Sequence, residues 1–273
     1  MIIDGKKIAQ KIKNKIRRQL KNKRARPGLA VILIGDNPAS LSYIKQKKIA
    51  TKYCFINFKL FHFNNTAPEK LILKTISNLN KNKKINGIVV QLPLPKKFNT
   101  QKIIDAIDPE KDVDGFRLKS RFSSPTHQAI IKAIQSTGEN LNPPVGGKII
   151  SLVGKKSIFT TGLEKRLIKL FPKSKIKLYS FKYDSSAKIK KGTKIADVVI
   201  VALGEAEWLK SNMIKRGVII IDVGFNKKNN AITGDVSKNV YPKAKHYTPV
   251  PGGIGPMTVA YLINNVFKSF KCA

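Results

Sequence analysis

The chain has 273 residues, of which 42% are hydrophobic and 25% charged, and its formal net charge at pH 7 is +37. This composition is that of a globular protein with one large or two smaller domains, and it excludes a disordered, collagen-like or coiled-coil chain. Apolar runs such as Val198–Leu203 are far shorter than the roughly 20 residues of a membrane span, so no membrane partner is expected.

Two further features concern location and metals. The N-terminal residues carry lysines where the apolar region of a secretion signal would lie. The two cysteines, Cys54 and Cys272, form neither a disulfide framework nor a metal-ligand spacing. We therefore expect a cytoplasmic protein and predict no metal site.

The excess of positive charge suggests a polyanionic partner. Lysine, however, is spread over nearly every segment and greatly outnumbers arginine, which is the better reader of phosphates and base edges. This distribution favours a general compositional bias towards Lys, Asn and Ile, so we predict no specific nucleic-acid partner. A basic nucleic-acid-binding protein is the alternative from another functional class, and only the charge supports it.

Helices and strands are predicted to alternate in the first half of the chain. The expected elements are a helix over 2–22, a strand over Leu29–Ile34, a helix from about Ser40, a strand over Phe58–Phe63, a helix over Pro68–Lys81 and a strand over Ile85–Leu92. This alternation is typical of an α/β domain with a parallel sheet.

A second alternating block follows a predicted linker helix over Thr126–Gln135. Its expected elements are strands over Gly147–Val153, Ile176–Ser180, Asp197–Leu203 and Val218–Val223, and a helix over Thr161–Phe171. A last amphipathic helix, Thr258–Phe270, is expected to pack back onto the first block. The predicted fold is therefore α/β, with two α/β domains around a cleft that forms the ligand site.

Three polar side chains share one face of the helix that begins near Ser40. Tyr43 and Lys47 lie four residues apart, and Ser40 lies one turn before Tyr43. A hydroxyl, a phenol and an amine can line one surface in this way, although the spacing alone favours a solvated lysine.

Two more segments place polar groups at strand ends or in loops. Gln91 ends an apolar strand before Leu92–Pro95, where its amide either faces the ligand crevice or merely ends the strand. Asp112 and Asp114 lie two residues apart, so they either bind the edge of a heterocycle or only shape a turn.

The segment Thr248–Thr258, TPVPGGIGPMT, holds three prolines and three glycines within 11 residues. Such a composition fixes an unusual backbone path with exposed amides, which favours a ligand-contacting loop over a plain connector.

These four segments, in this order, together with Ile221–Asn226 and Gly234–Val236, resemble the methylenetetrahydrofolate dehydrogenase/methenyltetrahydrofolate cyclohydrolase family. The resemblance covers almost the whole chain. It implies a catalytic folate-binding domain of residues 1–121 and 251–273, and a Rossmann-like NAD(P)-binding domain of residues 122–250. It also implies a homodimer that oxidises 5,10-methylenetetrahydrofolate with NADP and hydrolyses the methenyl product to 10-formyltetrahydrofolate, in one-carbon metabolism and purine biosynthesis.

The resemblance also assigns site residues. It implies catalytic roles for Lys47, Tyr43, Gln91, Asp114 and Ser40, with Tyr43 and Asp114 also binding the pterin. It places Pro251, Gly252 and Gly253 in the loop that lines the folate. Residues implied for the cofactor are Gly154, Lys155, Lys156, Ser157, Ser180 and Ile221.

The nucleotide half departs from the family pattern. Where the family reads roughly GRSxxVGxP, this chain has Lys155 and Lys156 in place of Arg and Ser, and Thr160 where a glycine would admit phosphate. The stretch Tyr179–Lys182 likewise lacks the family's arginine. The segment between Phe116 and Thr126 is several residues shorter than is usual in the family.

Two interpretations within the family therefore stay open. One is a bifunctional enzyme with an eroded but working cofactor site, whose local lysines favour NADP over NAD. The other is a cyclohydrolase with an eroded cofactor site that has lost, or nearly lost, the redox step.

Overall fold

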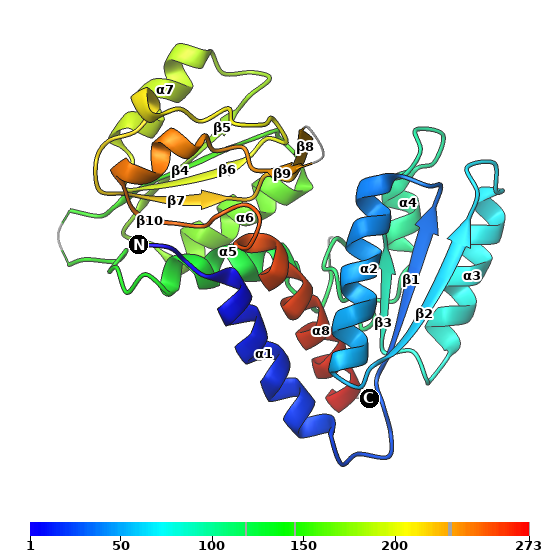
Figure 1. Cartoon of the computed structure of the whole chain (residues 1–273). Coiled ribbons are helices and arrows are strands. Elements are labelled where there is room, and N and C mark those ends of the chain that lie inside the picture. The colour runs from blue at the N-terminus through cyan, green and yellow to red at the C-terminus, as the bar shows by residue number, and fades with distance from the viewer. Residues whose placement is uncertain (118, 145, 229–230, 273) are drawn as a thin grey trace. The chain divides into compact units, whose positions relative to one another are not determined.

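The structure is a computed structural model that describes residues 1–117, 119–144, 146–228 and 231–272. The chain forms two compact units (Figure 1). The three-stranded unit comprises Ile8–Pro125 and Thr258–Ala273, and the five-stranded unit comprises Met1–Lys7 and Thr126–Met257.

The three-stranded unit has a parallel sheet in the order β2-β1-β3. Its strands are β1 (Gly28–Ile34), β2 (Asn57–Phe63) and β3 (Gly87–Val90), and its helices are α2 (Pro38–Tyr53), α3 (Glu69–Lys81), α4 (Thr100–Asp105) and most of α1 (Gly5–Leu20) and α8 (Ile254–Cys272).

Strand β1 shows why this unit has three layers, because all of its side chains are buried. Leu29, Val31 and Leu33 pack in one cluster with residues of α1, α2 and α8. Ala30 and Ile32, on the opposite face, pack with residues of α3 and α4. A strand buried on both faces reads as a continuous apolar run, which is how the sequence identifies it.

The five-stranded unit has a parallel sheet in the order β10-β7-β6-β4-β5. Its sheet strands are β4 (Ile149–Gly154), β5 (Lys175–Ser180), β6 (Val198–Ala202), β7 (Val218–Asp222) and β10 (Ala244–Tyr247). Its helices are α5 (Pro125–Gln135), α6 (Ile158–Leu170) and α7 (Ser186–Ile195), with short 3-10 turns η1 (Ser211–Met213) and η2 (Lys238–Lys243). An antiparallel hairpin of β8 (Asn226–Lys228) and β9 (Ala231–Thr233) is separate from the main sheet.

Both sheets reverse their strand order beside their first strand. In the three-stranded unit the chain runs from β1 to β2 on one side and returns to β3 on the other. In the five-stranded unit β5 lies on one side of β4, and β6 on the other. Parallel α/β sheets bind ligands outside the carboxyl ends of the two strands at such a reversal. The fold therefore indicates one candidate site after β1 and β3, and another after β4 and β6.

The predicted α/β class and every strand expected from the sequence are confirmed, with shifts of at most two residues at the strand ends. The sequence analysis did not predict α4, α7, β10 or the β8–β9 hairpin. The last helix packs with the first block as expected, since Thr258 onwards belongs to the three-stranded unit. Among the helices in the described ranges, none has the length and apolar character that a membrane crossing requires.

The observed units differ from the expected domains at three short segments. Met1–Lys7 and residues 251–257 belong to the five-stranded unit, and residues 122–125 belong to the three-stranded unit. For the first two segments the reason is local pairing: the Ile3 amide donates to the Tyr247 carbonyl at 2.8 Å. In addition, Gly5 lies so close to Gly253 that a Cβ on Gly5 would meet the Gly253 carbonyl oxygen at 1.8 Å.

Two fully buried carboxylates hold the loops at the carboxyl ends of β6 and β7. Asp235 accepts hydrogen bonds from the amides of residues 203, 204 and 205, at 2.6–3.0 Å, and from the Asn226 side chain at 2.9 Å. Asp222 accepts from the amides of residues 224, 235 and 236, at 2.9–3.0 Å. These buried acceptors join segments that are distant in sequence, so the strand-end loops depend on them.

We expect Asp235→Ala to lower the free energy of unfolding by about 3 kcal/mol, because three backbone amides, one of them fully buried, lose their acceptor. Urea unfolding followed by circular dichroism measures this change. Glu205→Ala is the matched control, because Glu205 is exposed and its ion pair with Lys155 should contribute less than about 1 kcal/mol. Equal effects of the two substitutions would contradict the structural role of Asp235.

Candidate active site

Lys47 belongs to the buried stripe of α2. The stripe is formed by Ser40, Ile44, Lys47 and Thr51, which recur at the helical spacing of four, three and four. Asn37 starts the helix, since its side-chain oxygen accepts from the amides of Ala39 and Ser40 at 3.0 and 3.1 Å. Lys47, which is only 7% exposed as a residue, therefore lies on the side of α2 that packs inward.

Gln91 is the hydrogen-bond partner of this amine. It directly follows β3, and its backbone amide donates to the Ile32 carbonyl of β1 at 2.9 Å. Its side-chain NH₂ donates to the Leu92 carbonyl at 3.0 Å, which leaves Oε1 to accept from Lys47 Nζ at 2.8 Å. The Ser40 hydroxyl reaches the same Leu92 carbonyl at 3.4 Å. The strand end thus orients both Gln91 and Ser40.

Burial and one carboxylate set the charge state of the amine. Desolvation lowers the pKa of Lys47, while the negative charge of Asp114 opposes this shift. Desolvation also raises the pKa of Asp114, which the charge of Lys47 lowers and that of Asp112 raises. Burial raises the pKa of the half-buried Tyr43 phenol, which therefore stays protonated. The three-stranded unit accordingly brings together a lysine with a lowered pKa, a glutamine and a carboxylate.

The two aspartates of the loop that follows Pro109 have different environments. Asp112 is 1% exposed, and its two oxygens accept from the amides of Gly115 and Arg117, each at 3.0 Å. Gly115 has φ +67°, and a Cβ there would meet the Phe122 carbonyl oxygen at 2.6 Å, so the turn requires glycine. Asp112 therefore shapes the turn, and the half-buried Asp114 carries the charge felt by Lys47.

Two residues that sequence reasoning missed hold this loop in place. Asn265 of α8 is 1% exposed and donates to the carbonyls of Val113 and Ser123, at 2.9 and 3.0 Å. The Lys111 amine donates to three carbonyls at the end of α3, those of residues 79, 80 and 82, at 2.7–3.1 Å. The available signal for Asn265 was an amide within an otherwise apolar helix stripe.

The loop after β4 lies at the strand-order reversal of the five-stranded unit. Gly154 ends β4, and a Cβ there would meet the Thr160 methyl group at 2.8 Å. Ser157 caps α6, and its hydroxyl accepts from the Thr160 amide at 3.3 Å. The Thr160 hydroxyl accepts from the Ser157 amide and donates to the Lys155 carbonyl, at 3.0 and 2.9 Å. Thr160 is thus turned into the loop that it supports and is 1% exposed.

The charges of this loop lie on two exposed lysines. Lys155 pairs with Glu205, which follows β6, at 3.5 Å, and Lys156 is exposed. This ion pair links the ends of β4 and β6, where the fold indicates a ligand. A glycine without room for a Cβ, two cations and the N-terminus of α6 fit the diphosphate of a dinucleotide.

The remaining residues implied for ligands lie at different places in the five-stranded unit. Ser180 ends β5 and is 7% exposed, and its hydroxyl has no hydrogen-bond partner among the described residues. Ile221 is fully buried within β7, where it pairs with Ile200 of β6. Pro251, Gly252 and Gly253 precede α8, and Gly252 has φ +116°.

In the described ranges, no three His, Cys, Asp or Glu residues gather into a group that would hold a metal ion.

Family models match both parts of the chain. Residues 3–114 match the catalytic domain of tetrahydrofolate dehydrogenase/cyclohydrolase, and residues 124–273 match the NAD(P)-binding domain of the same family. The chain belongs to the tetrahydrofolate dehydrogenase/cyclohydrolase family. The resemblance found in the sequence is therefore confirmed, as are the Rossmann-like second unit and the assignment to an enzyme family.

Similar proteins match this family member over its full length. The bifunctional protein FolD of Bacillus pumilus is 38% identical, over 99% of this chain and 97% of its own. The solved structure of the bifunctional enzyme FolD from Campylobacter jejuni is 35% identical, with a TM-score of 0.90 over 100% of this chain and 99% of that one. The Trypanosoma brucei enzyme, solved with NADP and an inhibitor, is 24% identical, covers 100% of this chain and 97% of its own with a TM-score of 0.90, and shows the same fold.

The different environments of the two aspartates give a testable contrast. We expect Asp112→Ala to lower the free energy of unfolding by about 2–3 kcal/mol, because it leaves two amides without an acceptor. Asp114→Asn should leave stability unchanged or raise it, since desolvation disfavours the Asp114 charge. Urea unfolding of both variants measures the difference, and a larger loss for Asp114→Asn would reverse the assignment.

Proposed function

We propose that this family member oxidises 5,10-methylenetetrahydrofolate with NADP and hydrolyses the resulting methenyl compound to 10-formyltetrahydrofolate. Family membership supports both activities. The observation that supports the hydrolytic reaction is the buried Lys47 amine. It is hydrogen-bonded to Gln91 at 2.8 Å, and the charge of Asp114 acts on its pKa.

Hydrolysis requires a base beside an electrophilic carbon. Water adds to the methenyl carbon and loses one proton to a base. The C–N5 bond then breaks as the new hydroxyl loses its second proton and N5 takes one up, which leaves the formyl group on N10 and releases one proton overall. A neutral amine can accept that proton, and desolvation favours the neutral form of Lys47. Gln91 Oε1 accepts from Lys47 Nζ and so directs the nitrogen lone pair away from itself, towards the reacting water.

The neighbouring side chains bind and orient the substrate in this proposal. Asp114 accepts hydrogen bonds from the amino-pyrimidine edge of the pterin, and Tyr43 provides an aromatic face and a protonated phenol. Ser40 holds the Leu92 carbonyl, to which Gln91 is also bonded. Pro251, Gly252 and Gly253 line the folate, as the family resemblance implies.

In the oxidative half, bound NADP would supply the hydride acceptor, and residues around the β4 loop would hold it. Gly154 allows the backbone of the loop to approach the diphosphate, and Lys155, Lys156 and the Ser157-capped end of α6 supply positive charge. Ser180 contributes a buried hydroxyl at the end of the adjacent strand, and the backbone of Ile221 lies in β7. The lysines favour the extra phosphate of NADP over NAD.

The family resemblance also supports a homodimer that works in the cytoplasm and supplies formyl groups to purine biosynthesis. These points, and a folate cleft between domains of residues 1–121 with 251–273 and 122–250, stay predictions.

Replacing the amine tests the hydrolytic half. We expect Lys47→Met to reduce methenyltetrahydrofolate hydrolysis at least about 100-fold, because the general base is lost. The variant should be at least as stable as the wild type at pH 7, since a disfavoured buried charge is removed. The stability difference between Lys47→Met and the wild type should narrow as the pH rises. The reason is that folded Lys47, with its lowered pKa, loses its proton at a lower pH than Lys47 of the unfolded chain. Absorbance of the methenyl chromophore and urea unfolding provide the two measurements.

Lys48→Met is the matched control, because Lys48 is the exposed neighbour on the same helix. Its hydrolysis rate should equal that of the wild type. An undiminished rate in folded Lys47→Met would remove Lys47 from the mechanism.

Replacing a cation of the β4 loop tests the oxidative half. We expect Lys155→Ala to raise the KM for NADP about 3- to 10-fold while hydrolysis stays unchanged, because a phosphate partner is lost. Lys165→Ala, at an exposed position of α6, is the control and should leave the KM unchanged. NADPH formation is followed separately from methenyl loss, and hydrolysis without NADPH formation by the wild type would establish the cyclohydrolase-only alternative.

A further inference from the structure

Arginine is not distributed like lysine in this chain. The sequence holds eight arginines, and four of them, Arg17, Arg18, Arg24 and Arg26, lie within ten consecutive residues. A compositional bias towards lysine accounts for scattered lysines but not for this cluster. The cluster therefore needs an explanation from its surroundings.

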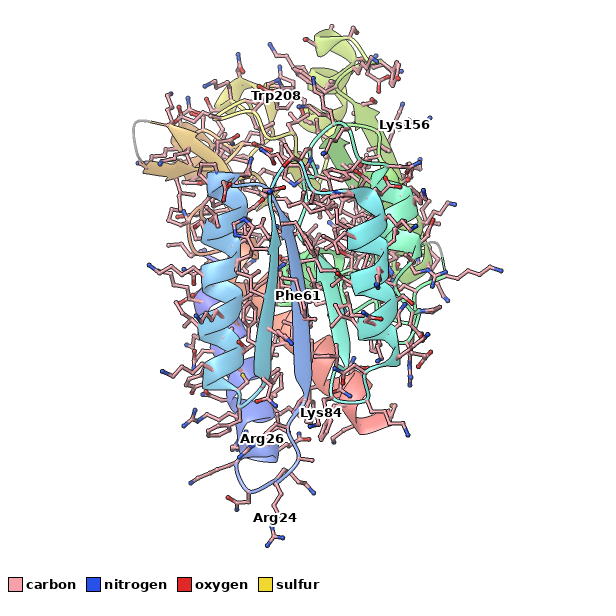
Figure 2. The ribbon with its side chains drawn as sticks, turned by 90° about the vertical axis from the view of Figure 1, so that its right-hand side faces the viewer. Arg24, Arg26, Phe61, Lys84, Lys156 and Trp208 are labelled. Atoms are coloured by element: carbon pink, nitrogen blue, oxygen red, sulfur yellow. The ribbon has the colours of Figure 1, made fainter. Side chains whose placement is uncertain are left out.

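Three loops meet where these arginines lie. The loop between α1 and β1 contacts the α2–β2 loop, because the Asn57 amide donates to the Pro27 carbonyl at 2.8 Å. It also contacts the turn before β3, because a Cβ on Gly28 would meet the Lys84 carbonyl oxygen at 2.1 Å. Figure 2 shows Arg24, Arg26 and Lys84 at the same end of the three-stranded sheet. We call this surface the basal rim, and it consists of Arg17, Arg18, Lys21, Lys23, Arg24, Arg26, Lys52, Lys83 and Lys84.

Aromatic rings lie between the arginines of the basal rim. The Arg17 guanidinium lies over the rings of Tyr53 and Phe55, with its carbon 4.7 and 4.6 Å from the ring centres. The Arg26 guanidinium lies over Phe55 at 4.8 Å. A hollow of about 490 Å³ is lined by Asn14, Arg17, Arg18 and Tyr53. Planar cations and rings beside an open hollow can stack on an unpaired base.

The basal rim has few acidic residues to neutralise it. The sequence contains no Asp or Glu between residues 5 and 35, or between 37 and 68. Within the described ranges, no rim cation has an ion-pair partner, whereas cations of both units elsewhere do. Glu110, on the loop that flanks β3, is paired with Arg121. The rim charge is therefore available to an external partner.

The basal rim is distinct from the folate site. It lies at the amino end of β1, whereas Gln91 and Lys47 lie at the carboxyl ends of the strands. The seven residues of β1 separate these ends by about 20 Å at 3.3 Å per residue. A folate bound beside Lys47 does not account for the rim charge.

We infer that the basal rim binds the backbone of single-stranded RNA without sequence preference, as a second activity of this enzyme. Lysines and arginines neutralise phosphates, and the Arg17–Tyr53–Phe55 stack and its hollow accept an unstacked base. None of the exposed large hydrophobic side chains lies between residues 3 and 40 or between 50 and 59 in the described chain, so the rim lacks the apolar anchors of a membrane-inserting surface. RNA fits these observations better than a lipid surface does.

The test measures binding of a fluorescein-labelled 20-nucleotide polyuridylate to the full-length protein by anisotropy, at several salt concentrations. The rim variant carries Arg18→Gln, Lys23→Gln, Arg24→Gln and Lys84→Gln, which are all exposed positions. We expect its affinity at 0.1 M salt to fall at least about tenfold. The slope of log K against log salt should fall by up to about 3, since each lost phosphate contact contributes about 0.7.

A matched control removes the same charge elsewhere. It carries Lys165→Gln, Lys169→Gln, Lys191→Gln and Lys194→Gln, at exposed positions of α6 and α7. Its affinity should stay within about twofold of the wild type, and the rim variant should hydrolyse methenyltetrahydrofolate at the wild-type rate, which shows that it is folded. If hydrolysis is absent from the wild type as well, the proposed function fails while the RNA measurement still stands.

Three outcomes would overturn the inference. The first is equal loss of affinity in the rim and control variants, which would assign binding to net charge alone. The second is no detectable binding by the wild type at micromolar protein and 0.1 M salt. The third is rim-dependent binding to vesicles of phosphatidylglycerol that is tighter than binding to the RNA, which would assign the rim to a lipid surface.

Discussion

The hydrogen bond between Lys47 and Gln91 is the interaction on which the chemistry of the three-stranded unit depends. A lysine in the buried stripe of a helix is unfavourable unless its amine has a partner, because desolvation penalises the charged form. The partner is supplied by the end of β3, and the backbone bond from Gln91 to Ile32 of β1 fixes that strand end. Polar contacts thus offset only part of the cost of burying the amine, and the result is an amine with a lowered pKa at the carboxyl edge of a sheet.

The two units use one topology for two kinds of site. Each sheet reverses its strand order beside its first strand, and each first strand leads through a short loop into a helix. After β1 the helix presents side chains, those of Ser40, Tyr43 and Lys47. After β4 the loop itself, with Gly154 and the Ser157 cap, is the feature that fits a ligand. This chain has Lys155 where the family pattern has an arginine, which changes how the positive charge is presented to a phosphate. The loop itself is unaffected, because its hydrogen bonds come from Ser157 and Thr160.

Much of this arrangement could be predicted from the sequence, because strands buried on both faces leave continuous apolar runs such as Leu29–Ile34. Helix α7 was missed because Ser186–Ile195 contains four lysines and only one residue, Ile189, of the hydrophobic cluster it joins. Strand β10 was missed because Ala244–Tyr247 is four residues long, with a charged residue and a histidine. In both segments tertiary contacts outweigh the local pattern.

The site residues divide in a similar way. Spacing placed Ser40, Tyr43 and Lys47 on one helix face, but it could not show that this face is buried. The two aspartates after Lys111 could not be distinguished, since their difference arises from amides that fold back onto Asp112 alone. The sequence could at most mark Asn265 as an amide in an apolar helix stripe. It could not identify the carbonyl partners, Val113 and Ser123, because they are more than 140 residues away in the chain.

The same principle applies to charge. Of the chain's 16 acidic residues, Asp112, Asp222 and Asp235 are almost completely buried, and each accepts at least two backbone amides. A lysine side chain cannot accept these hydrogen bonds from backbone amides. A compositional bias towards lysine therefore cannot replace the aspartates at these positions. Arginine in the basal rim has comparable geometric demands, because the Arg17 guanidinium stacks on two rings while donating to the Tyr53 carbonyl at 2.6 Å. A lysine ammonium can offer only one of these contacts at full strength. The net charge is therefore a property of the whole composition, whereas the basal rim is a property of the fold.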